Sequence, residues 1–106
     1  MPSTKKPASS KRASLPREAA YEKRFVKDWE RLCRSGRYNM KQLKEAMMIL
    51  IANDAPLGQE WLDHPLKGEW SDHRECHIGG DFLLIYAIEG NLVNFVRAGT
   101  HSELFE

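Results

Sequence analysis

All four histidines of this chain lie in its last 43 residues, and three of them fall within the stretch HPLKGEWSDHRECHIGGDFLLIY, residues 64–86. These three are His64, His73 and His77, and the fourth is His101 in the closing segment RAGTHSELFE. Carboxylates and an arginine accompany them. Because imidazole can both accept and donate a proton near neutral pH, this group is suited to acid–base catalysis or to metal binding.

The segment around these histidines has the pattern of three β-strands. The stretches HRECHI, DFLLIYAIE and LVNFVRAG are separated by Gly79-Gly80 and Gly90-Asn91. Both pairs suit the two-residue turns of β-hairpins, in which backbone φ angles are positive. The sequence therefore predicts an antiparallel meander.

The length of the two turns predicts which side chains share a face of the sheet. With Gly79-Gly80 as the first turn, His77 lies opposite Phe82, and in the second hairpin Tyr86 lies opposite Phe95. One face is small and apolar, and we expect helices to cover it. The other face is expected to hold His73, Glu75, His77, Tyr86, Phe95 and Arg97, with Phe82 and Leu84 beside them.

Strand spacing argues against a metal site built on these histidines. His73 and His77 share a face but stand about 13 Å apart at the rise of a strand, which is too far for one ion. The two cysteines, Cys33 and Cys76, form no C-x-x-C pair. We expect no metal and no other cofactor, and we interpret the cysteines as reduced, buried thiols in a reducing cytoplasm.

The acid–base interpretation fits the chemistry of RNA cleavage. A base removes the proton of the 2′-hydroxyl, an acid protonates the leaving 5′-oxygen, and a cation stabilises the charge on the phosphate. Several histidines together with Arg97 meet these needs, and aromatic rings on the same face can stack on unpaired bases.

Two amphipathic helices and a candidate strand precede the meander. Residues 17–23, REAAYEK, form the candidate strand. The first helix is predicted to end at Gly36, and Asn39 with Gln42 can form a capping box that begins the second. Residues 55–70 are irregular. The apolar stripes are Phe25, Trp29, Leu32 and Cys33 in the first helix, and Leu43, Met47, Leu50 and Ile51 in the second. The predicted fold is α+β, with a two-helix hairpin packed on one face of a curved antiparallel sheet.

Charge divides the 106 residues into two parts, although the net charge is only +1. The first 17 residues carry five basic side chains and no acid, whereas the rest carry 11 basic and 15 acidic ones. We expect residues 1–16 to be a disordered basic tail, although such a tail can also attract nucleic acid. No apolar run reaches the length of a membrane span and no secretory signal is recognised, so we expect a cytoplasmic protein without a membrane partner.

From residue 17 to 106 the chain closely resembles the YafQ family of bacterial toxins in the RelE/ParE superfamily. The resemblance rests on the order of the motifs DHPL-G-W, R-x-x-H, D-x-x-L-I-Y and R-x-G-T-H-x-x-L-F. It implies a toxin of a type II toxin–antitoxin pair that cuts messenger RNA in the A site of the 70S ribosome without a metal. It also implies a DinJ-like ribbon–helix–helix antitoxin, through which alone the toxin would reach operator DNA.

The resemblance also implies roles for individual residues. His101 is expected to be the general acid, while His77 and His64 act as base or position the phosphate. Asp81 would orient one imidazole, and Arg97 would stabilise the pentavalent phosphate. Residues expected to bind or position RNA are Phe105, Glu75, His73, Tyr86 and Phe95. The family often has aspartate where this chain has Glu75.

Two other functions remain open at the level of sequence. A ParE-like toxin shares the fold but poisons gyrase and lacks the histidine set. The second alternative is a noncatalytic domain that binds RNA or an antitoxin, which would keep the fold but no longer cleave RNA. The four histidines and the GTHSELF segment favour the nuclease.

Overall fold

The two long helices form where the sequence predicts them. The computed structural model describes residues 15–105. Helix α1, Lys23–Ser35, ends at Gly36, whose φ of 68° is left-handed. Helix α2, Met40–Ala52, begins after Asn39, whose side-chain oxygen accepts a hydrogen bond from the Gln42 backbone at 2.9 Å. The predicted capping box is only half formed, because the Gln42 side chain accepts from the side-chain amide of Asn39.

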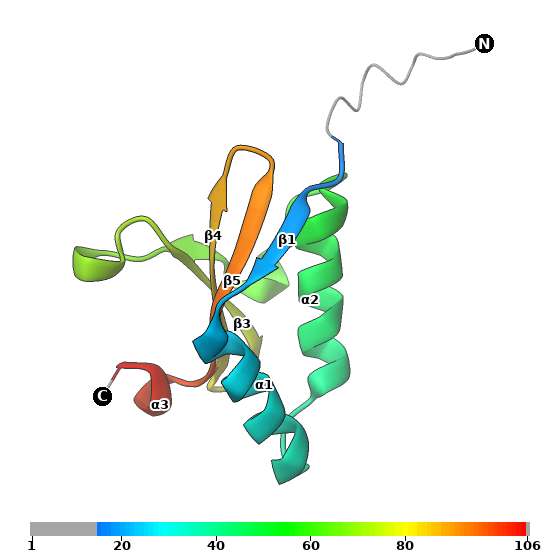
Figure 1. Cartoon of the computed structure of the whole chain (residues 1–106). Coiled ribbons are helices and arrows are strands. Elements are labelled where there is room, and N and C mark those ends of the chain that lie inside the picture. The colour runs from blue at the N-terminus through cyan, green and yellow to red at the C-terminus, as the bar shows by residue number, and fades with distance from the viewer. Residues whose placement is uncertain (1–14, 106) are drawn as a thin grey trace.

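The sheet is larger than the predicted meander. Its five strands lie in the order β1-β5-β4-β3-β2. The meander consists of β3 (Arg74–Gly79), β4 (Phe82–Glu89) and β5 (Leu92–Thr100). The candidate strand forms as β1 (Glu18–Tyr21), which pairs parallel with β5, and the two-residue strand β2 (His64–Pro65) pairs antiparallel with β3. The predicted α+β class and its antiparallel core are confirmed, and β1 adds a parallel edge (Figure 1).

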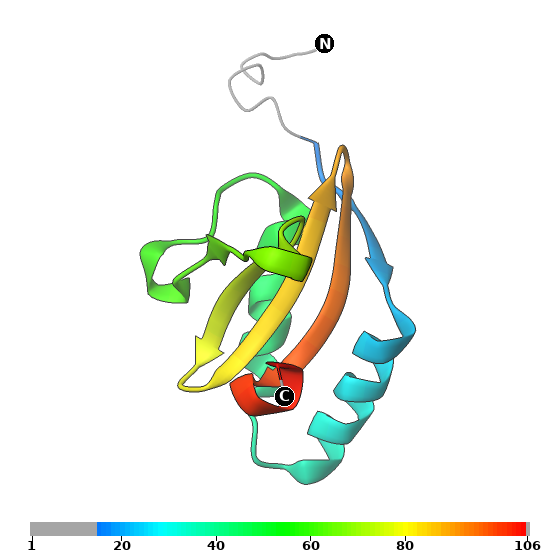
Figure 2. The same ribbon diagram turned by 90° about the vertical axis from the view of Figure 1, so that its left-hand side faces the viewer.

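The sheet separates two apolar clusters. Helices α1 and α2 cover one face, with Phe25, Leu32, Leu43 and Leu50 packed against strand residues. On the other face lies the short helix α3, His101–Phe105, whose Leu104 packs on a smaller cluster (Figure 2). The strand residues in the larger cluster are Cys76, Ile78, Phe82, Leu84, Tyr86, Val93, Phe95 and Ala98, and those in the smaller one are Leu83, Ile85 and Val96.

The prediction of which β4 side chains lie on which face of the sheet was wrong. The first turn is Gly80-Asp81, not Gly79-Gly80, so Gly79 pairs with Phe82 and His77 pairs with Leu83. A β-bulge between His77 and Gly79 causes the shift. Because strand side chains alternate, a slip of one residue exchanges the faces of a whole strand. The predicted pairing of Tyr86 with Phe95 is confirmed, and a second irregularity between Ile85 and Tyr86 then places Arg97 opposite Ile85.

The stretch predicted to be irregular contains short ordered pieces. Two 3-10 turns, η2 (Gln59–Trp61) and η3 (Gly68–Trp70), flank β2. The expectation of two buried cysteines is half right, because Cys76 is buried whereas Cys33 is exposed. Most of the predicted basic tail, residues 1–14, lies outside the described residues. Within residues 15–105, no helix is long and apolar enough to cross a membrane.

Candidate active site

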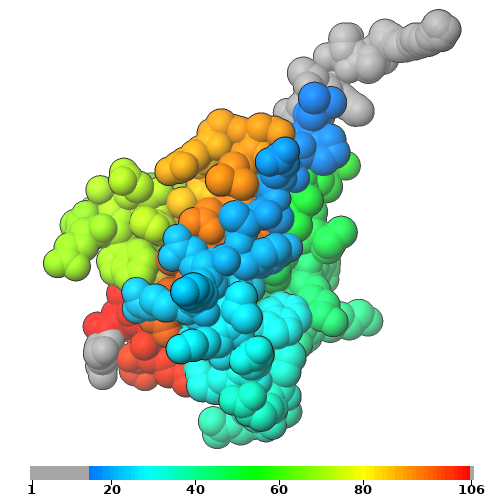
Figure 3. Space-filling view, in the orientation of Figure 1, coloured from blue at the N-terminus to red at the C-terminus, as the bar shows by residue number. Residues whose placement is uncertain are grey.

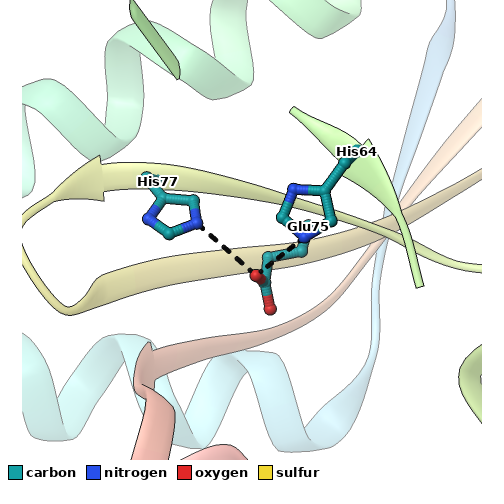
Figure 4. A group of neighbouring side chains, drawn as sticks. All are labelled: His64, Glu75 and His77. Carbon is teal, nitrogen blue, oxygen red and sulfur yellow. Dashed lines mark ion pairs between the residues drawn. The ribbon is translucent and has the colours of Figure 1, made fainter. Parts of the chain in front are cut away.

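Three of the predicted site residues meet at the edge of the sheet formed by β2 and β3. The pairing of His64 with Glu75 brings the two strands together, and His77 lies two residues further along β3. The Oε2 atom of Glu75 lies 3.2 Å from Nε2 of His64 and 3.6 Å from Nε2 of His77. Figure 4 shows the carboxylate between the two imidazoles. We call His64, Glu75 and His77 the histidine–carboxylate trio.

Asp63 anchors the loop that carries His64. Its carboxylate accepts hydrogen bonds from Nε and Nη2 of Arg74, at 3.0 and 2.8 Å, and from the hydroxyl of Tyr86. Burial, and then the bond to Asp63, raises the pKa of Tyr86 above its usual range, so the phenol stays a donor. His64 is therefore held on β3 by the residue directly before it.

The surroundings of His64 fit a protonated imidazole. Its Nδ1 lies 2.8 Å from the carbonyl oxygen of Leu62, which can only accept a hydrogen bond, so Nδ1 must carry a hydrogen. Its Nε2 faces the carboxylate of Glu75. Both nitrogens thus face acceptors, and this arrangement suits the imidazolium form, which has two donors. His64 can place a positive charge at the site.

Helix α3 brings His101 and Phe105 to the same face of the sheet as the trio. His77 of β3 pairs with Leu83 of β4, which pairs with Gly99 of β5. Gly99 therefore lies two strand spacings, or roughly 10 Å, from His77. His101 follows two residues after Gly99, and its ring lies 4.9 Å from that of Phe105 between centroids. The backbone N–H of His101 donates to Asp81 at 3.3 Å. Asp81 therefore holds the start of α3, and its described contact is not with an imidazole.

The structure does not bring Tyr86 and Phe95 to this face. Both are almost fully buried in the cluster beneath α1 and α2, at 2% and 0% exposure, so their rings cannot stack on a base. The expectation that they contact RNA was wrong, because the bulge reversed the faces of β4. His73 lies outside the trio: its Nδ1 is buried without a described hydrogen bond, and its ring packs edge-on against Trp70.

Arg97 is also directed elsewhere, to a buried aspartate that the sequence did not reveal. Its Nε and Nη2 donate to Asp28 of α1 at 2.7 and 3.0 Å, and the arginine side chain is only 13% exposed. Asp28 also accepts the backbone N–H of Ala98. Burial by itself would raise the pKa of Asp28, but the bonds from Arg97 and Ala98 outweigh it and hold that pKa below its usual value. The geometry gives Arg97 a structural role rather than a phosphate contact.

The trio can also hold a metal ion. One ligand atom from each of His64, Glu75 and His77 lies within 4.8 Å of the other two. Strand spacing excludes an ion shared by His73 and His77, but not one shared by His64, Glu75 and His77. The pairing of His64 with Glu75 could not be predicted, because a two-residue strand such as β2 leaves no periodic signal.

An apolar hollow elsewhere does not compete with the trio as a catalytic site. It lies between β1, α1 and α2, has a volume of about 280 Å³, and is lined by Tyr21, Phe25, Val26, Trp29 and Met47. These residues offer no acid–base pair.

Comparison with known proteins assigns the chain to a family. Residues 17–106 match the family described as bacterial toxin of type II toxin–antitoxin system, YafQ. The mRNA interferase toxin YafQ of Escherichia coli strain K12 is 37% identical over 91 residues, which cover 86% of this chain and 98% of the relative.

Solved structures agree with this match. The E. coli DinJ–YafQ complex contains a chain that matches with a TM-score of 0.77 and 38% identity, over 85% of this chain and 99% of that one. A metal-bound toxin from Helicobacter pylori matches with a TM-score of 0.75 and 41% identity, over 84% and 99%. The chain is thus a toxin of a type II toxin–antitoxin system. It belongs to the YafQ family, as the motifs of the sequence predicted.

Proposed function

We propose that this toxin cleaves messenger RNA in the ribosomal A site by metal-independent acid–base catalysis and thereby stops translation. The observation that carries the proposal is the gathering of His64, Glu75 and His77 on the same face of the sheet as α3, the helix that presents His101. The predicted enzyme class is confirmed, since the curated relatives are named mRNA interferases and the chain is accordingly an endoribonuclease.

Each side chain has a role that its surroundings support. His77, whose imidazole has no described hydrogen bond, is the base that accepts the 2′-hydroxyl proton. His101, exposed at the start of α3, donates a proton to the leaving 5′-oxygen. His64 as an imidazolium stabilises the charge that develops on the phosphate, in place of the Arg97 that the sequence suggested.

Three further residues hold this arrangement. Glu75 orients the imidazole of His64 at 3.2 Å, and the same oxygen lies 3.6 Å from the imidazole of His77. Asp81 fixes the first backbone N–H of α3. Phe105, which packs against His101, positions a nucleotide beside the acid.

The openness of the site supports a need for the ribosome. The side chains of His64 and His77 are 46% and 31% exposed, and His101 is exposed as well. An open surface cannot by itself align the 2′-oxygen, the phosphorus and the leaving oxygen in a flexible RNA. The ribosome would supply that orientation, whose contribution to rate is large. We expect little cleavage of free RNA.

The expected partners follow from the family. A relative has been solved in complex with DinJ, and we propose a DinJ-like ribbon–helix–helix antitoxin for this chain, with operator DNA reached only through it. The 70S ribosome and its messenger RNA are the functional targets. We therefore expect the toxin to act in the cytoplasm.

A purified translation system with a defined message tests the proposal. The 5′ ends of the products would be mapped by primer extension for the wild-type toxin and for His101→Ala. We expect cuts within codons only when ribosomes are present, and a rate about 10²–10⁴-fold lower in the variant, as for loss of a general acid. Efficient cutting of free RNA, or full activity of folded His101→Ala, would refute the proposal.

A further inference from the structure

Helix α3 is too short to hold its own position. It has five residues, and an isolated helix of that length is unstable in water. Its orientation, and with it the direction of the His101 imidazole, therefore depends on what it contacts. Leu104 anchors one side of the helix in the smaller apolar cluster, and Phe105 packs edge-on against Trp70 at 5.9 Å between ring centroids.

Glu103 joins α3 to a helix on the opposite face of the sheet. One of its carboxylate oxygens accepts the backbone N–H of Thr100 at 2.8 Å, while the N–H of Glu103 donates to the Thr100 hydroxyl, which completes a capping box. The other oxygen accepts from Nη1 of Arg31 at 2.9 Å. Figure 3 shows the C-terminal segment lying against α1.

Arg31 is itself held in place at the end of β5. Its Nη2 donates to Asp28 at 3.2 Å and to the carbonyl oxygen of Ala98 at 3.5 Å. Gly99 leaves room for the contact between Arg31 and Glu103 as it stands, because a Cβ there would lie 2.7 Å from the Glu103 carboxylate and 3.3 Å from the Arg31 guanidinium and would displace these side chains. The lack of a side chain at Gly99 thus makes space for the Arg31–Glu103 contact two residues before His101, the proposed catalytic acid.

We propose that Arg31, acting through Glu103, is a positioning residue that fixes the orientation of α3 and of the His101 imidazole. Neither residue touches the RNA in this proposal, which rests on the proposed function of His101. The pair is partly exposed, at 39% and 36%, and such pairs contribute little to global stability. The ion pair therefore acts on the orientation of α3. Leu104 keeps the helix packed on the sheet, and the ion pair fixes the rotation of the helix about its axis.

A double-mutant cycle tests the pair. The proteins are wild type, Arg31→Met, Glu103→Gln and the double variant, with Arg34→Met as the control that removes an exposed arginine from the same helix. We expect each single change to lower kcat about tenfold with little effect on KM, because misplacing a catalytic group slows the chemical step. The double variant should be no slower than either single one, since the two residues act through one contact. Arg31→Lys should recover much of the rate, and Arg34→Met should leave kcat unchanged.

A spectroscopic measurement separates this inference from the proposed function. The imidazole resonances of His101 would be followed by NMR in the same proteins, and they should shift in Arg31→Met and Glu103→Gln but not in Arg34→Met. If the wild-type toxin does not cut RNA on ribosomes, the proposed function fails. The NMR shifts would still decide whether the Arg31–Glu103 pair determines the orientation of the His101 imidazole. Unmoved resonances, independent effects of the two changes on kcat, or an equal loss in Arg34→Met would overturn the inference. Should Arg31→Met fail to fold, Glu103→Gln and Arg31→Lys carry the test.

Discussion

At the scale of single residues, Glu75 is the centre of the site. Its carboxylate is 8% exposed and contacts both imidazoles of the trio through one oxygen. Sequence reasoning placed Glu75 and His77 on one face correctly, because residues two apart in a strand share a face. The family resemblance placed His64 at the site as well, but strand spacing could not reveal its contact with Glu75, since that contact depends on a loop folding back onto β3.

We predict that Glu75→Gln lowers the rate of cleavage by about 10–100-fold, as expected for the loss of a hydrogen bond to a charged group. The amide keeps the shape of the side chain but loses the charge that stabilises the imidazolium of His64. Initial rates of codon cleavage in the purified translation system measure the effect. Glu75→Asp is the matched control and should be the more active of the two, and equal activity of Glu75→Gln and wild type would contradict the assigned role.

The trio also predicts sensitivity to transition metals. Zn²⁺ prefers imidazole and carboxylate ligands, and its binding to His64, Glu75 and His77 would occupy the nitrogens that acid–base catalysis needs. We expect micromolar Zn²⁺ to inhibit cleavage and a chelator selective for Zn²⁺ over Mg²⁺ to restore it, whereas this chelator alone leaves the rate unchanged. Loss of activity on chelation alone would instead indicate that a metal takes part in the reaction. His77→Ala should weaken Zn²⁺ binding, as measured by calorimetry.

At the scale of elements, the sequence predicted regular helices well and irregular contacts poorly. The ends of α1 and α2 follow from local signals, a left-handed glycine and an asparagine cap. The bulge in β3 follows from no such signal, and it moved Tyr86 and Phe95 into the core. Helix α3 does have a local signal, because Thr100 and Glu103 have the spacing of a capping box.

Asp28 is the clearest case of a contact that only the assembled elements reveal. It lies three residues after Phe25 on the buried side of α1, where sequence reasoning expects an apolar residue. Its partners Arg97 and Ala98 are some 70 residues away in β5. No local pattern predicts such a pair.

We predict that Asp28→Asn destabilises the fold by about 2–4 kcal/mol, because it leaves the guanidinium of Arg97 buried without its counter-charge. Since the folded-state pKa of Asp28 lies below its ordinary value of 3.8, its contribution is fully present above about that pH and is lost as the pH falls through the lower folded value. Urea unfolding from pH 3 to 7 measures this. The gap between wild type and variant should narrow below pH 4, and a gap independent of pH would contradict the assignment. Glu30→Gln, an exposed site on the same helix, is the control.

At the scale of the whole molecule, the first described residues, Leu15 and Arg17, contact the C-terminal end of α2. The carbonyl oxygen of Leu15 accepts from Asn53, and Arg17 donates from its backbone to Ile51 and from its side chain to Leu50. The family match likewise begins at residue 17.

We predict that a chain starting at residue 15 keeps the thermal midpoint of the full chain within about 2 °C, since we expect the removed residues to belong to a disordered basic tail. Its cleavage rate on ribosomes at physiological salt should also be retained. Differential scanning calorimetry and the translation assay measure the two quantities. The shortened chain lacks four of the five basic side chains of residues 1–17. If ribosome binding by the shortened chain depends less strongly on salt, these side chains contact phosphates in the full chain.

Two side chains of α1 also bind backbone groups along the part of β5 that β1 does not cover. Strand β1 covers β5 only from Leu92 to Phe95, and beyond that point Asp28 and Arg31 bind the N–H and C=O groups of Ala98 as a neighbouring strand would. An unsealed edge is a template on which another chain can add a strand. The same two residues that support the fold and orient α3 thus occupy backbone groups to which a strand of another chain could otherwise bind.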